Sequence, residues 1–281
     1  MQGRAVDCSG RPRADKRGLR LRYAHADESS AAADAAAAQP RMRRSLEAER
    51  VAALSDRLRV ARDPAHEPLN LEPWLEPLRA WQNARLARSF ADLARQPRYE
   101  MATRFFLDDL YGTHDMSWRD RELTLMLPTL TRWLPPAVLR TVGDAIELDL
   151  VSHQFDLAMS GALRAIAPAA QPPALDLELY GRAYRATGTP ETRGRQIDLI
   201  VDLGRDLDRV VRLPMIAGVL RIARGPALAA GLGGMHAFLE RGFAAFRSMR
   251  GADEFLAAVA TRERAAMRRL FGADPDPFRL P

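Results

Sequence analysis

The chain has almost no lysine and almost no cysteine. Of its 42 basic residues only Lys16 is a lysine, and Cys8 is the single cysteine among 281 residues. One cysteine excludes an intramolecular disulfide and any zinc site built from several cysteines. A thiol without a disulfide partner suits a reducing compartment, and residues 1–22 lack the apolar stretch of a secretory signal. We therefore expect a cytoplasmic protein.

Common catalytic signatures and a membrane span are also missing. The sequence contains no Glu-x-x-His pair, no His-Glu-x-x-His zinc motif, no phosphate-binding Gly-Lys-Ser/Thr loop and no Gly-x-Ser-x-Gly elbow. We therefore predict no cofactor and favour a protein that is not an enzyme. The most apolar stretch, residues 213–235, is interrupted by Arg221, Arg224 and Pro226. We interpret it as two buried helices and predict no membrane association.

Arginine gives the chain its basic character. The formal net charge is +6, and the arginines are spread along the chain among 36 acidic residues. This spacing is typical of a GC-rich coding sequence, whereas a nucleic-acid binder usually gathers lysine and arginine into patches. Arginine-mediated binding of nucleic acid is therefore a minor alternative.

Three regions differ in composition. Residues 1–41 contain an alanine tract and few large apolar residues, so we expect a disordered or mis-called N-terminal extension, with Met42 as an alternative start. Residues 42–272 have the composition of a helical domain, and residues 273–281 form a tail. A candidate seam at 167–174 reads Ala-Pro-Ala-Ala-Gln-Pro-Pro-Ala. Large apolar faces on both sides of this seam favour one shared core.

Helical periodicity dominates from residue 45 onward. Apolar residues recur at three- and four-residue spacing, and no stretch alternates as a strand between hairpin turns. We predict an all-α bundle of about nine helices around a single large core. The helices are expected at residues 45–61, 73–95, 98–111, 118–133, 136–166, 175–187, 190–211, 214–223 and 226–270, the last broken near Gly251. Small residues at 225, 229 and 233 indicate a close helix crossing.

The helix expected at 136–166 is the most informative element, because its apolar face also carries charged groups. Asp149, His153 and Asp156 fall in the same sector as Ile146 and Leu150. Burying charged groups without partners is costly. The cluster is therefore either a structural polar network or a binding site.

Both interpretations name specific residues. As a site, the three side chains can meet on one face and hold a divalent metal, or serve as general acid and base. Asp109, in the apolar face of residues 98–111, and His114, in the following loop, are further ligand candidates. As a structural network, the aspartates pair with buried arginines and the histidine bonds to a carbonyl. Candidate partners on the apolar sectors of neighbouring helices are Arg85, Arg193 and Gln196.

Several short stretches are distinctive enough to compare with known families. Residues 105–112 read Phe-Phe-Leu-Asp-Asp-Leu-Tyr-Gly, and further stretches are Arg119-Asp120, Leu134-Pro135, residues 144–149, residues 180–185, Gln196-Ile197 and residues 238–243. On these stretches the chain resembles an uncharacterised family of helical proteobacterial proteins, a domain of unknown function. The resemblance covers about residues 45–270. It implies a compact helical domain and brings no activity, ligand or partner.

Three functions are consistent with these observations. The first is a non-enzymatic adaptor or regulator that acts through its surface, with a protein partner or as a homo-oligomer. The second is a helical bundle that binds a small ligand or metal at the level of the buried Asp/His cluster, since bundle cores commonly build sites from facing helices. The third is the arginine-mediated nucleic-acid binder.

Overall fold

The computed structural model describes residues 42–110, 117–168, 172 and 174–280. The chain divides into two units, residues 1–46 and 47–281. In the first unit only residues 42–46 are described, and they are helical. The predictions made for residues 1–41 and for His114 lie outside the described residues.

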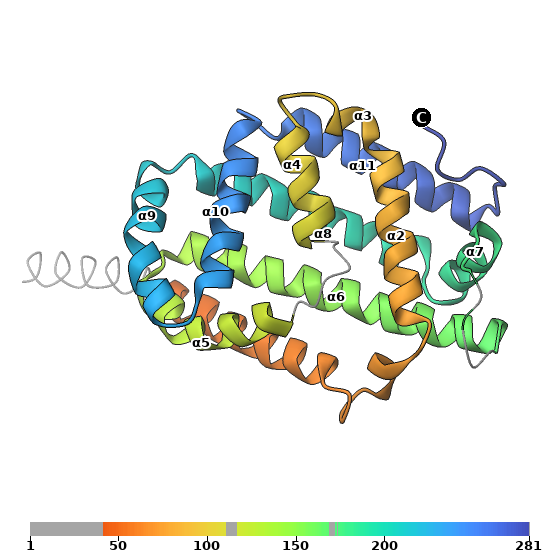
Figure 1. Cartoon of the computed structure of the whole chain (residues 1–281), viewed down its shortest axis with the longest axis horizontal. Helices are drawn as coiled ribbons and strands as arrows, with labels where there is room; N and C mark the ends of the chain where they lie inside the picture. The colour runs from red at the N-terminus through yellow and green to blue at the C-terminus, as the bar shows by residue number, and fades with distance from the viewer. Residues whose placement is uncertain (1–41, 111–116, 169–171, 173, 281) are drawn as a thin grey trace, which may run out of the picture. The chain divides into compact units, whose positions relative to one another are not determined.

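The second unit is built from helices, as Figure 1 shows, and its described residues contain no strand. The prediction of an all-α bundle is therefore confirmed. The α-helices are residues 47–62, α2 (Leu75–Ser89), α3 (Ala91–Ala94), α4 (Glu100–Arg104), α5 (Ser117–Trp133), α6 (Pro136–Ile166), α7 (Leu177–Ala186), α8 (Pro190–Val211), α9 (Pro214–Ala229), α10 (Gly233–Ser248) and α11 (Asp253–Phe271). A short 3₁₀-helix, η1 (Pro68–Leu71), and a π-helix, η2 (Phe105–Leu110), complete the set.

Helix boundaries follow local chemistry, with two corrections to the sequence prediction. Thr189 caps α8, since its Oγ1 accepts a hydrogen bond from the Thr192 amide at 3.3 Å. The helix expected at 73–95 is split at Phe90 into α2 and α3. The helix break expected just before Pro226 is wrong, because α9 continues through this proline and the turn falls at Gly231, with φ of +72°. Proline removes one helical hydrogen bond, whereas the left-handed backbone at glycine ends the helix.

The long helices α6, α8 and α11 lie side by side in the second unit, with α8 in contact with the other two (Figure 1). Helices α2 and α10 cross this layer, α2 against α6 and α10 against α8. Helix α9 packs on α10 and α8. Apolar residues before and after the predicted seam, Leu163 of α6 and Tyr180 of α7, share one core cluster.

Helix α6 passes from one apolar cluster to another. Its first half contributes Ile146 and Leu150 to a cluster with the helix over residues 47–62. Its second half contributes Met159 and Leu163 to a cluster with α2, α7, α8 and α11. Of the charged residues expected to be informative, His153 and Asp156 lie between these two clusters along α6, and Asp149 lies directly before Leu150 of the first cluster.

Candidate functional site

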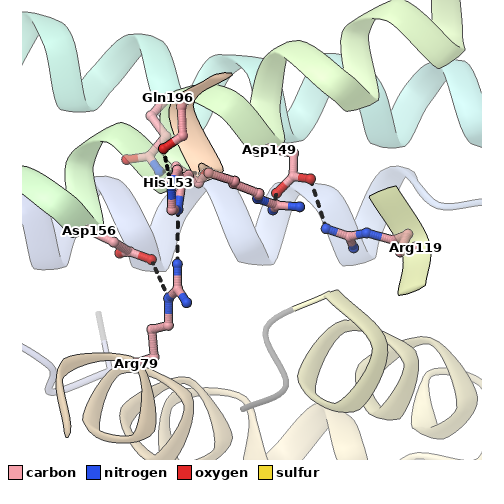
Figure 2. A network of polar contacts seen from close by, with 9 residues as sticks. Arg79, Arg119, Asp149, His153, Asp156 and Gln196 are labelled. Carbon is pink, nitrogen blue, oxygen red and sulfur yellow. Dashed lines mark hydrogen bonds and ion pairs between the residues drawn. The ribbon is translucent and has the colours of Figure 1, made fainter. Parts of the chain in front are cut away.

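Six charged or ionisable side chains meet where α6 changes from one apolar cluster to the next. We call this set the polar layer, and Figure 2 shows most of its contacts. Its members are Arg62, Arg79, Arg119, Asp149, His153 and Asp156. The three arginines come from the helix over residues 47–62, from α2 and from α5. The layer therefore ties three elements to α6.

Asp149 binds two arginines at once. Its Oδ1 accepts a hydrogen bond from Arg62 Nη2 at 2.7 Å, and its Oδ2 accepts one from Arg119 Nη2, also at 2.7 Å. The three side chains are between 12% and 27% exposed, so solvent screens these ion pairs only in part. Asp149 thus connects two helices to α6 through one carboxylate.

His153 is almost fully buried, and both of its ring nitrogens have partners. Arg79 Nη2 lies 2.9 Å from Nδ1, and the Ala61 carbonyl oxygen lies 3.1 Å from Nε2. A guanidinium can only donate, so Nδ1 accepts and Nε2–H donates to the carbonyl. Burial, and next the charge of Arg62, lower the pKa of His153 to about 4. The imidazole is therefore neutral at pH 7 and has one tautomer.

Asp156 shares a guanidinium with the histidine. Arg79 Nε donates to Asp156 Oδ2 at 3.3 Å, while Nη2 of the same side chain donates to His153. Burial raises the pKa of Asp156, and the charge of Arg79 opposes this rise. One arginine of α2 therefore bridges two residues of α6 that lie one helical turn apart, as Figure 2 shows.

The arginines and glutamine singled out from the sequence have other neighbours. Arg85 is buried, and Nη1 pairs with Glu263 of α11 at 2.5 Å. Burial works against the charge of Arg85, but the Glu263 carboxylate raises its pKa. Gln196 Nε2 donates to Ser152 Oγ at 3.0 Å, which adds a bond from α8 to α6. The expectation that Arg85 pairs with an α6 aspartate is therefore corrected, because its carboxylate partner is Glu263 of α11.

Arg193 is buried between two aromatic rings. Its guanidinium carbon lies 3.8 Å from the ring centre of Phe155 and 4.3 Å from that of Tyr184. Its Nη2 donates one hydrogen bond to Thr187 Oγ1 at 3.3 Å, which satisfies one of the donors of the guanidinium group. Burial lowers the pKa of Arg193. The two aromatic faces stabilise this cation. Arg193 forms no ion pair with a described carboxylate.

Asp109 lies outside the polar layer. It belongs to the π-helix η2, and Arg241 of α10 binds its carboxylate through two nitrogens, at 2.9 and 2.6 Å from Oδ1. Asn83 donates to the carbonyl of Leu107 at 2.7 Å and satisfies a polar group of the same π-helix. The structure therefore gives Asp109 a different arginine partner from those of the α6 aspartates.

The composition of the polar layer favours arginine–carboxylate pairing over cation binding. Three guanidinium groups surround two carboxylates and a neutral imidazole, so a divalent cation would meet an excess of positive charge. Both imidazole nitrogens already have partners. Among the described residues, no group of three His, Cys, Asp or Glu side chains is placed to hold a metal.

The sequence interpretation missed Arg62, Arg79 and Arg119. A weak signal existed for Arg79, because Leu75, Arg79 and Gln82 lie on one side of α2 at helical spacing. Arg119 lay within a stretch used for the family resemblance. Periodicity alone did not indicate which helix faces α6 at this level.

A second candidate site is an exposed apolar surface on α9. Met215, Val219 and Ile222, spaced along one face of the helix, are 60%, 48% and 75% exposed. We call this surface the α9 face, and its members are Met215, Gly218, Val219, Ile222, Gly225, Pro226 and Ala229. All residues of α9 are described and none is buried.

The α9 face corrects the interpretation of residues 213–235 as two buried helices. The apolar composition was right, but only one side of α9 packs on α10 and α8, and its other side is uncovered in the described residues. The close crossing expected at Gly225 is also wrong within the described chain, because nothing there lies within 4 Å of a Cβ added at this position. No helix in the described residues has the length and apolarity needed to cross a bilayer.

Comparison with known proteins identifies the family. A family described as a domain of unknown function, DUF8198, matches residues 61–277, a range that contains both the polar layer and the α9 face. No curated protein and no solved structure matched the chain. Since the family match covers well over half of the sequence, the chain belongs to the DUF8198 family of domains of unknown function.

Proposed function

We propose that the protein is a non-enzymatic adaptor or regulator that binds a protein partner through the α9 face. The observation that carries this proposal is the exposure of Met215, Val219 and Ile222 on one side of a helix that buries no residue of its own. Contiguous apolar surface of this kind is uncommon on a monomer and usually marks an interaction site. The partner covers the apolar side of α9 that the described chain leaves exposed.

The polar layer also supports the proposal that the protein is not an enzyme. Its carboxylates and its imidazole have arginine or carbonyl partners, so it works as a structural clamp between α6 and its neighbours. A buried Asp/His site for a small ligand is the second candidate function. The only feature that favours this function is the excess of guanidinium groups in the polar layer. These groups attract an anionic ligand and repel a metal cation.

The nucleic-acid alternative loses support because many arginines already have acidic partners. Examples in which the pair joins different helices are Arg50 with Asp144, Arg241 with Asp109 and Arg262 with Asp92. We also propose a cytoplasmic location and the proteobacterial origin that the family resemblance implies. Neither proposal affects the test of the α9 face.

Affinity capture with the purified full-length chain tests the proposed function. The wild-type chain and an Ile222→Glu variant are immobilised and exposed to extract from the native host. A charge at a position that is 75% exposed in the free protein leaves folding intact but disrupts an apolar interface. We expect one partner in stoichiometric yield with wild type, and at least a tenfold lower yield with the variant.

Leu71→Glu is the matched control, because Leu71 is 72% exposed and belongs to η1. This variant should recover the partner as wild type does. Equal recovery by all three proteins, or no specific recovery by wild type, would overturn the proposed function. Recovery that is lost with both variants would indicate a general effect of surface charge.

A further inference from the structure

The segment that follows α11 turns back onto the helices of the domain. Residues 274–280, which we call the tail, contain no helix or strand, and most of them are exposed. The exceptions include Pro277, which is buried, and Phe278, which packs against the core cluster that contains Tyr180. The attachment of the tail to the domain therefore depends mainly on two neighbouring residues.

The surface beneath Phe278 is aromatic and carries a buried cation. Trp81 of α2 and Tyr180 of α7 stack with their ring centres 4.0 Å apart. Phe278 lies edge-on to both rings, with centre-to-centre distances of 5.8 Å to Trp81 and 6.4 Å to Tyr180. The guanidinium carbon of Arg85 lies 5.0 Å from the centre of the Phe278 ring. A phenyl ring at this position thus meets two aromatic partners and one cation.

Arg85 also has a donor that the described residues leave unused. Its Nη1 pairs with Glu263, but its Nε is buried and has no hydrogen-bond partner among the described residues. A buried donor without an acceptor is unfavourable, and the ring of Phe278 offers no acceptor oxygen. The surface beneath Phe278 therefore has a hydrogen-bonding capacity that the tail does not fill.

The tail leaves α11 through a strained turn and makes few polar contacts. Ala273 has φ of +53°, in the left-handed region that favours glycine. The amide of Asp274 closes the helix by donating to the Arg269 carbonyl at 3.0 Å. Beyond Asp274, one hydrogen bond joins the tail to the rest of the described chain, from Arg269 Nη1 to the carbonyl of Arg279. Little besides Pro277 and Phe278 therefore opposes the release of the tail.

The sequence of the tail has the chemistry of a docked peptide. Pro275 and Pro277 precede Phe278, and proline has no backbone N–H and a fixed φ. Such a segment cannot continue α11, and it loses little conformational freedom when it binds. Proline-containing segments use this property to dock on grooves lined by aromatic residues. The stacked rings of Trp81 and Tyr180 provide a surface of this kind.

We propose that Trp81, Tyr180 and Arg85 form a docking site for a segment in which phenylalanine follows proline, and that the tail occupies this site in the free protein. A partner with such a segment displaces the tail, and an oxygen that reaches Arg85 Nε gives the partner an advantage over it. Because the tail is tethered to α11, its effective concentration at the site is high, so the tail keeps the site closed to weak ligands. The site is formed by α2 and α7, and the inference does not depend on the α9 face.

Peptide binding to the full-length chain tests the proposal. The probe is a labelled peptide with the sequence of residues 273–280, and fluorescence anisotropy measures its dissociation constant. We expect the Phe278→Ala variant to bind this peptide at least tenfold more tightly than wild type, because its own tail no longer competes. A second peptide, with alanine in place of the phenylalanine, should bind the variant at least tenfold more weakly than the first.

Three further variants serve as control, as locator and as a safeguard against misfolding. Leu280→Ala should bind the peptide within a factor of two of wild type, since Leu280 is 57% exposed. Adding Trp81→Leu to Phe278→Ala should remove the tight binding. Arg279→Glu breaks the ion pair with Asp274 and leaves Phe278 in place, so it loosens the tail without changing the core. It should bind the peptide at least threefold more tightly than wild type, and it decides the question if Phe278→Ala does not fold.

Each remaining outcome overturns the proposal. If neither Phe278→Ala nor Arg279→Glu binds the peptide more tightly than wild type, the tail is a fixed part of the core. Equal binding of the two peptides would mean that the phenyl ring is not recognised. A wild-type dimer that Phe278→Ala abolishes would place the tail in the site of a second copy, so that it does not close its own. The capture experiment with Ile222→Glu tests the α9 face separately, and neither experiment decides the other.

Discussion

Arg79 Nη2 of α2 donates a hydrogen bond to His153 Nδ1 of α6 over 2.9 Å, and the imidazole can accept this bond only in its neutral form. The same guanidinium also binds Asp156. A protonated ring would lose this bond and would repel Arg79. The contact therefore links the charge state of one buried histidine to the attachment of α2.

The depressed pKa of His153 makes stability depend on pH. The folded state keeps the ring neutral down to about pH 4, whereas in the unfolded chain it takes up a proton near its ordinary pKa of 6.5. The unfolded state therefore binds more protons between these values, and the free energy of unfolding falls as pH falls from 6.5 to 4. Over this pH range the titration of His153 lowers the free energy of unfolding by about 3 kcal/mol. Urea unfolding at a series of pH values measures it.

His153→Gln isolates this effect, because glutamine does not titrate. The raised pKa of Asp156 acts with the opposite sign, stabilising the fold as pH falls, and it is common to both proteins. We expect a smaller loss of stability between pH 6.5 and 4 in the variant. His66→Gln is the control, since His66 is 59% exposed and pairs only with Asp63 of its own turn. Parallel curves for wild type and His153→Gln would contradict the assignment.

Removing the Asp149 carboxylate should destabilise the fold. Asp149→Ala leaves Arg62 and Arg119 without the acceptor that they share, and breaking a largely buried pair in this way costs about 3 kcal/mol. Asp202→Ala removes the exposed pair with Arg205 and should cost less than about 1 kcal/mol. Chemical denaturation compares the two variants. Unchanged or increased stability in Asp149→Ala would favour a ligand site, because functional groups are often held at a cost in stability.

Arg193 should not tolerate lysine. Its flat guanidinium lies between the rings of Phe155 and Tyr184, and an ammonium group cannot stack on both faces. We expect Arg193→Lys to lower the free energy of unfolding by about 1 to 2 kcal/mol. Arg205→Lys, at a side chain that is 59% exposed, should change it by less than about 0.5 kcal/mol. Equal effects of the two changes on the melting temperature would rule out a special role for the stacking.

Helix positions could be predicted wherever local chemistry sets a boundary. The break at Pro135 and Pro136 and the cap at Thr189 placed α6 and α8 correctly. The sector of α6 that holds Asp149 and His153 also followed from periodicity alone. These features depend on residues within a few positions of one another, which the sequence contains directly.

Two features could not be predicted in the same way: the ion-pair partners of buried side chains, and whether the chain itself covers an apolar helix face. Arg85 is buried as its sector indicated, but its partner Glu263 is 178 positions away. The apolar residues of α9 predicted burial, yet an apolar face specifies only that something should cover it, not that the same chain does so. Which helix faces which depends on the whole packing arrangement, so the arginines of the polar layer emerged only from the structure.

Two helical glycines should respond in opposite ways to alanine. A Cβ at Gly204 of α8 would lie 2.4 Å from Leu256, which is buried in the core, so Gly204→Ala should destabilise the protein by about 1 to 3 kcal/mol. At Gly218 of α9 the same atom meets nothing within 4 Å, so Gly218→Ala should stabilise the free protein by about 0.5 to 1 kcal/mol. Urea denaturation of both variants tests the contrast. A loss of stability in Gly218→Ala would mean that the α9 face is already covered in the free protein, because only a close neighbour makes an added methyl group unfavourable there.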